Sequence, residues 1–217
     1  IMFSIGCASI WLGLLNSVQE ICKEKVILQK EHMADLKLSS YLLSKFIVQG
    51  IIAFIQATLL VGIFQKIVGS SENSILINGY WDIQFVSFLS ILAAASTGLF
   101  ISAVVKNSNI AMSVIPLILV PQLLYSGMLF KLDEITDFVS NFVLCRWTVE
   151  ALGTSVNLND LTHIAQTINP LIEIEPENYF TFTTEHMIEV IGIILLMTAV
   201  LMLASYFVLR KNVNKNM

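Results

Sequence analysis

Long apolar stretches, separated by clusters of charged residues, constrain this chain more than any other feature. A helix of about 20 apolar residues is long enough to cross the roughly 30 Å hydrocarbon layer of a bilayer. Of the 217 residues, 56% are hydrophobic and 13% are charged, whereas soluble domains carry about 25% charged residues. We therefore expect an all-α polytopic transmembrane helix bundle. The predicted spans cover residues 1–18, 46–64, 85–105, 110–130 and 188–209.

The basic residues predict how the bundle is oriented, because Lys and Arg near short loops are retained in the cytoplasm. One side of the predicted spans holds nine of them: Lys23, Lys25, Lys30, Lys37, Lys45, Lys106, Arg210, Lys211 and Lys215. The other side holds Lys66, Lys131 and Arg146. We expect a cytoplasmic segment at 19–45, a cytoplasmic C-terminus and an external loop at 131–187, in a plasma (inner) membrane protein.

Five spans that end in the cytoplasm must begin outside. We therefore expect these to be the last five spans of a six-span unit, with a further span before Ile1. The spans are too interdependent to form separate domains, and no internal repeat is visible. We expect residues 1–217 to form one transmembrane domain.

The cytoplasmic segment at 19–45 mixes charged residues with apolar ones at helical spacing, which predicts an amphipathic helix. Two interpretations stay open for this segment. It could be a solvated, salt-bridged loop at the membrane surface, or a docking surface for a cytoplasmic partner.

Pro116 and Pro121 interrupt the fourth predicted span. Proline lacks the backbone N–H that a helix needs, so we expect a kink or a break there. Such a kink could be a packing feature, or it could be a hinge that bends the helix around a cavity.

Apolar runs within the external loop are typical of short re-entrant helices. Arg146 and Glu150, spaced i and i+4, can pair on such a helix, and we expect this exposed pair to be structural. Two stripes of small residues favour close helix contacts and need no role beyond packing. They are Ser9, Gly13 and Ser17 in the first span, and Ala94, Gly98 and Ser102 in the third.

Several functional classes find no support in the sequence. The net charge is −4, without a basic run, so no nucleic-acid partner is expected. His32, His163 and His186 lie in three different segments, and the three cysteines lack CxxC spacing, so we expect neither a metal site nor a disulfide framework. We expect no catalytic residue, no ATP-binding loop and no cofactor in this chain.

Three motifs give the chain a family resemblance. They are KEKVILQKEHMADLKLSSYLLSK at 23–45, PQLLYSGMLF at 121–130 and RWTVEAL at 146–152. Together they resemble the second-span extension and coupling helix, the fifth span and the external loop of ABC exporters of the ABCG (White) type, within the type-2 ABC permease superfamily.

The resemblance implies a permease that works as a homodimer or heterodimer in membrane lipid. Its nucleotide-binding domain, fused upstream or in a separate chain, would carry ATP and Mg²⁺ and drive alternating access for a lipid, a hydrophobic drug or a peptide. The implied coupling residues are Glu24, Lys30, Glu31 and His32, the implied cavity residues are Ser9, Leu12, Val120 and Leu123, and the implied outer gate is Met128 and Leu129.

Two other functions stay open at this point. One is an accessory membrane subunit without its own transport path. The other is an intramembrane enzyme, although the sequence places no polar catalytic groups at a common depth.

Overall fold

The computed structural model describes residues 2–33, 35–69, 75–128, 134–160 and 180–215, and the regular structure in these ranges is helical throughout. The helices are α1 (Met2–Ser17), α2 (Glu20–Met33), α3 (Leu38–Val68), α4 (Gly79–Val104), α5 (Ser108–Leu124), α6 (Glu134–Ser140), α7 (Leu144–Ser155) and α9 (Thr184–Lys215). The prediction of an all-α membrane helix bundle is confirmed.

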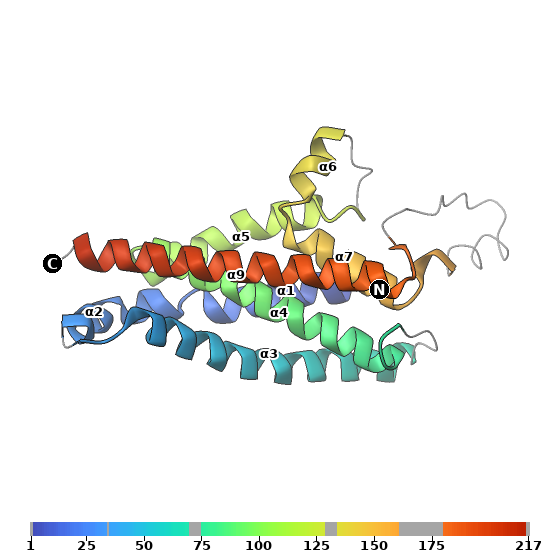
Figure 1. Cartoon of the computed structure of the whole chain (residues 1–217), viewed down its shortest axis with the longest axis horizontal. Coiled ribbons are helices and arrows are strands. Elements are labelled where there is room, and N and C mark those ends of the chain that lie inside the picture. The colour runs from blue at the N-terminus through green and yellow to red at the C-terminus, as the bar shows by residue number, and fades with distance from the viewer. Residues whose placement is uncertain (1, 34, 70–74, 129–133, 161–179, 216–217) are drawn as a thin grey trace.

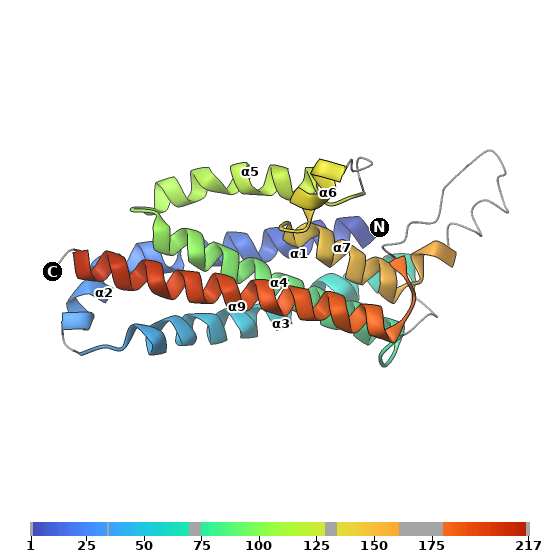
Figure 2. The same cartoon turned by 45° about the horizontal axis from the view of Figure 1, so that its top comes forward.

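The long helices lie side by side along one axis and alternate in direction (Figures 1 and 2). At one end, which we call the α2 end, lie α2, the turn between α4 and α5, and the C-terminus. At the other, the α7 end, lie α7 and the beginnings of α1 and α9. Most of the basic residues that predicted a cytoplasmic side therefore gather at the α2 end.

Helix α4 is the centre of the bundle and packs against α1, α3, α7 and α9. Its contact with α1 is closest where small residues meet. A Cβ atom at Gly13 would lie 2.1 Å from the Ile91 carbonyl oxygen, and one at Gly98 would lie 2.0 Å from Ser17 Oγ. Only glycine fits these two positions without a shift of the helices, so the predicted small-residue packing is present.

The start of α4 is fixed by a buried acid. Asp82, which is 1% exposed, accepts hydrogen bonds from the backbone N–H groups of Ile75, Leu76 and Ile77 at 2.8–3.1 Å. The Asn78 side chain caps the helix by accepting from the N–H of Tyr80. The segment before α4 is therefore folded back onto its first turn.

Four helices in the described part of the chain are long and apolar enough to cross a membrane, namely 2–31, 38–68, 79–104 and 184–213. The fifth, α5, has 17 residues and ends at Leu124, so it rises about 26 Å. It is therefore shorter than the predicted span 110–130, of which residues 129–130 lie outside the described ranges. Gly127 adopts φ +81 just beyond α5, a left-handed conformation in which the helix cannot continue.

The sequence predicts a kink or a break at the two prolines; a break is not observed, and the kink stays a prediction. Helix α5 is continuous through Pro116 and Pro121 and ends three residues after the second. Both prolines are exposed, and the helix buries only Ala111, Ile115 and Leu119. The proline rings therefore lie off the packed face and do not disturb the core.

Candidate coupling site and outer helices

The junction between α1 and α2 is fastened to α4 by a serine. The chain leaves helical geometry between Ser17 and Glu20, and the first N–H groups of the new helix have no partner within it. The N–H groups of Ile21 and Cys22 donate to Ser102 Oγ at 3.0 and 2.9 Å, in a buried environment. The sequence interpretation of Ser102 as a packing residue was therefore incomplete, because its hydroxyl caps α2.

A second connection joins α2 to α3. Lys45 Nζ lies 2.7 Å from Glu24 Oε1 and 3.3 Å from Glu20 Oε2. The Tyr41 hydroxyl donates to the other oxygen of Glu24 at 2.9 Å. We call Glu20, Glu24, Tyr41 and Lys45 the α2–α3 ion cluster. The Lys45 side chain is 17% exposed, whereas those of Glu20 and Glu24 are 35% and 41% exposed, so water partly screens the ion pairs of this cluster.

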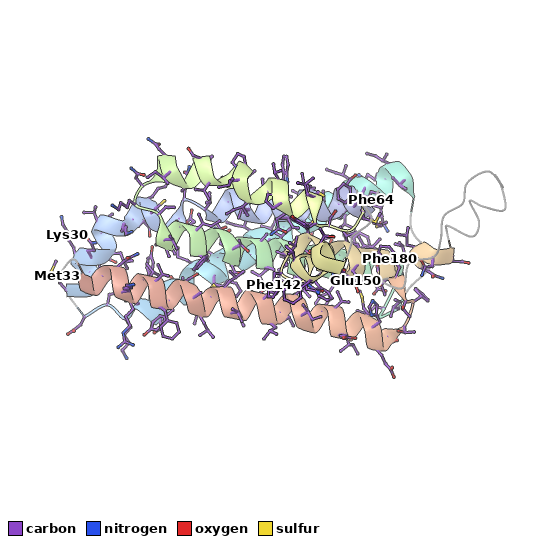
Figure 3. All side chains as sticks on the ribbon, turned by 90° about the horizontal axis from the view of Figure 1, so that it is seen from above. Lys30, Met33, Phe64, Phe142, Glu150 and Phe180 are labelled. Carbon is purple, nitrogen blue, oxygen red and sulfur yellow. The ribbon has the colours of Figure 1, made fainter. Side chains whose placement is uncertain are left out.

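Helix α2 divides into a buried and an exposed face. Ile21 and Leu28 are almost fully buried, whereas Val26 is 67% and Met33 68% exposed. Figure 3 shows Met33 beside Lys30 at the far tip of the α2 end. Apolar side chains that remain exposed on a charged helix are typical of a surface that binds another protein.

The predicted coupling residues all lie on α2, but in different settings. Glu24 belongs to the α2–α3 ion cluster. Lys30 and Glu31 are exposed in the last turns of α2, and His32 is in the same helix, although its side chain lies outside the described part of the chain. Their role in coupling stays a prediction.

The geometry at the C-terminal end of α2 sets the direction in which the chain leaves this helix. Asp35 has φ +69, and the Leu36 N–H donates to the Glu31 carbonyl at 3.1 Å. This bond, from the third residue after the helix back to Glu31 in its last turn, is characteristic of a Schellman ending. The chain then turns back into α3.

The predicted cavity residues lie on two helices, Ser9 and Leu12 on α1 and Val120 and Leu123 on α5, and their role stays a prediction. Ser9 is fully buried, and its hydroxyl finds no hydrogen-bond partner among the described residues. Leu12 packs against an apolar cluster that includes Ala53 of α3 and Ile91 of α4. Val120 is 53% exposed on α5, and Leu123 is half-buried. Of the predicted outer gate, Met128 is 40% exposed, and Leu129 lies outside the described residues.

At the α7 end, Arg146 is the centre of a polar network. Its guanidinium lies 2.9 Å from Asp137 Oδ1 and 2.8 Å from Asn141 Oδ1, and it donates to the Ser140 hydroxyl. Its Nε lies 3.8 Å from Glu150 Oε2. Arg146 and Glu150 were expected to be exposed, but they are 8% and 5% exposed. This expectation was wrong because α7 packs against α1, α4 and α9, while α6 supplies polar partners for Arg146.

Glu150 also meets His186 of α9, with its Oε1 3.2 Å from Nε2. Burial raises the pKa of Glu150 to about 7, although the positive charges of Arg146 and His186 act in the opposite direction. Figure 3 shows this side chain far from Lys30, toward the opposite end of the bundle. Burial between α7 and α9 therefore favours the neutral form of the Glu150 carboxyl.

Antiparallel apolar helices of membrane-spanning length, with a charged helix fastened at one end, define this chain as an integral membrane protein. A family model described as "ABC-2 type transporter" matches residues 1–155, from the first residue to the end of α7. The chain therefore belongs to the ABC-2 type transporter family, and the resemblance to type-2 ABC permeases is confirmed. No curated protein matches the chain.

Members of this family are the membrane component of ABC transporters and are not themselves catalytic. They generally act as dimers and with a nucleotide-binding ATPase. The matched region contains the whole of α2, the α2–α3 ion cluster and Ser102.

Proposed function

We propose that this chain is the transmembrane subunit of an ATP-driven ABC exporter, and that α2 receives the movement of the ATPase. One observation carries the proposal. Helix α2 is fastened on one face to α3 and α4, through Lys45 and Ser102, while its other face exposes Val26, Lys30 and Met33. A helix that must transmit force needs both a free face and firm attachments.

The attachments offer two routes from α2 into the membrane. A displacement of α2 acts on α3 through the ion pairs of Lys45 with Glu20 and Glu24. It acts on α4 through the buried hydrogen bonds of Ser102. Since α4 contacts α1, α3, α7 and α9, a shift at its cytoplasmic end reaches most of the bundle.

The substrate path would lie between two copies of the chain. Helix α5 buries one narrow face and leaves Leu117 73% and Val120 53% exposed, and Trp11 of α1 is 44% exposed. This apolar surface suits a lipid, a hydrophobic drug or an apolar peptide. In this arrangement Ser9, Leu12, Val120 and Leu123 lie near the cavity, Met128 and Leu129 close its outer mouth, and the α2 end with the C-terminus faces the cytoplasm of a plasma membrane protein.

The test uses the complete transporter, with its ATPase, in lipid vesicles. Lys30→Glu reverses a charge on the exposed face of α2 without touching the buried face. We expect permease-dependent ATP hydrolysis to fall by about fivefold or more, because a loss of about 1 kcal/mol in contact free energy corresponds to a factor of about five. Hydrolysis by the ATPase alone gives the baseline.

Lys211→Glu is the matched control, because Lys211 is also exposed and lies in the last turns of α9 at the same end of the bundle. It makes the same charge change away from α2 and should leave hydrolysis near the wild-type rate. Equal hydrolysis by the wild type and the Lys30→Glu variant, or an equal loss in both variants, would refute the role of α2.

A further inference from the structure

Two cysteines far apart in the sequence meet at the α7 end of the bundle. Cys7 lies in the first half of α1, and Cys145 lies in the first turn of α7. Cys7 packs against the buried apolar cluster that contains Cys145, and both are free thiols in this structure. Cys22, the third cysteine, lies on α2, at the opposite end of the bundle.

The packing of the two helices holds these thiols in place. Beside Cys7, a Cβ atom at Gly6 would lie 3.2 Å from Val149 Cγ2 and 3.3 Å from Thr148 Cγ2. Val149 follows Cys145 by one helical turn and so lies on the same face of α7. The α1 backbone is therefore pressed against the face of α7 that carries Cys145. This close approach favours the short Cα separation, about 4.4–6.8 Å, that a disulfide requires.

The two thiols differ in access. Cys145 is 1% exposed, whereas Cys7 is only partly buried. A reagent therefore reaches Cys7 first, and Cys145 is in position to react with whatever forms there. An accessible thiol beside a buried partner is the arrangement of a redox dithiol.

We propose that Cys7 and Cys145 form a redox-sensitive dithiol that closes to a disulfide between α1 and α7. The oxidant is a disulfide compound of the oxidising side of the membrane. The Cys7 thiolate attacks this disulfide and releases one thiol, and the Cys145 thiolate then displaces the second. One S–S bond breaks and one forms, and the two electrons lost by the cysteines reduce the oxidant to two thiols.

The disulfide would hold the outer helix α7 to α1 by a covalent bond. Helix α7 also carries Arg146 and Glu150, so the whole polar network of the α7 end would be fastened to the first helix. If the chain works by alternating access, as proposed above, oxidation restrains the outer end. The disulfide itself does not depend on that function.

The experiment measures thiols in the purified full chain after incubation with glutathione disulfide. Free thiols are alkylated in SDS, the protein is reduced, and the newly released thiols are alkylated with a second reagent before mass spectrometry. We expect Cys7 and Cys145 to change label together and to regain the first label after dithiothreitol treatment. Cys22 should keep the first label throughout, which makes it an internal control.

Variants and a gel complete the test. In Cys7→Ser, Cys145 should stay a free thiol under the same oxidation, whereas Cys22→Ser should behave as the wild type. On a non-reducing gel the oxidised chain should migrate as a monomer. The proposal is overturned if the wild-type cysteines keep the first label, if Cys7 carries only glutathione, or if the oxidised product is a disulfide-linked dimer. The wild-type result decides even if a variant does not fold.

Discussion

Replacing Ser102 by alanine tests whether the junction between α1 and α2 depends on a single hydroxyl. The Ser102 oxygen accepts two buried backbone N–H groups, those of Ile21 and Cys22. Alanine would leave both donors without a partner in a site that water does not reach. A buried donor that loses its partner costs about 1–3 kcal/mol. Two such donors would cost about 2–6 kcal/mol together; because both share one acceptor, we take the lower part of that range and expect a loss of about 2–3 kcal/mol.

Ser96→Ala is the matched control. Ser96 lies on the same helix and is fully buried, but its hydroxyl donates only to the Ala93 carbonyl of its own helix, at 2.6 Å. Removing this hydroxyl leaves no backbone N–H group without a hydrogen-bond partner, and the Ala93 carbonyl still has its helical partner. We expect Ser96→Ala to cost less than about 1 kcal/mol.

The free energy of unfolding can be measured by SDS titration in mixed micelles, with tryptophan fluorescence as the signal. Hydrogen exchange adds a local measurement, since the amides of Ile21 and Cys22 should exchange faster in Ser102→Ala and at the wild-type rate in Ser96→Ala. If the two variants unfold at the same SDS concentration, the proposed cap contributes nothing and the reasoning fails.

Two further predictions concern packing and pH. Gly13→Ala should lower the midpoint of thermal unfolding, because the new Cβ would meet the Ile91 carbonyl and overpacking costs about 1–3 kcal/mol. Gly62→Ala is the control and should not lower it, because no atom lies within 4 Å of that position. Equal unfolding midpoints for the two variants would contradict this prediction. The pKa of Glu150 near 7 exceeds the unfolded value of 4.5, so stability should fall by up to about 3 kcal/mol as the pH rises from about 4.5 to above 7. In thermal scans, Glu150→Gln should abolish this dependence of stability on pH, whereas Glu185→Gln, at an exposed residue, should retain it. An unchanged dependence of stability on pH in Glu150→Gln would contradict the role of the buried carboxyl.

Features that depend on neighbouring residues could be predicted from the sequence. Hydropathy is local, so it predicts the long helices. The observed ends differ where α3, α4 and α9 continue past the apolar stretch and where α5 ends at Leu124, before the predicted end at 130. The segment at 19–45, which we predict to be cytoplasmic, contains α2 and the first turns of α3. The close contact at Gly13 and Gly98 followed from the spacing of small residues.

Features that depend on distant partners could not be predicted. Ser102 is about 80 residues from the amides it accepts, and nothing in its own helix distinguishes it from a packing residue. The SSYLLSK motif contained Tyr41 and Lys45, but the motif alone did not show that both side chains reach Glu24. The sequence predicts Arg146 and Glu150 to be exposed because it does not show that α1, α4 and α9, which lie far from α7 along the chain, pack against this helix.

The length of α3 gives the molecule a mechanical property. Its 31 residues extend about 46 Å, roughly 16 Å more than the hydrocarbon layer is thick. Tyr41 and Lys45 lie in the first turns of α3, near the end that α2 holds. The eight residues that precede the predicted span at 46–64 account for about 12 Å of this excess, so a tilt of about 10° at the membrane surface would displace the tip of α3 by about 2 Å. A small rotation of α3 would therefore displace α2, and a displacement of α2 would rotate α3.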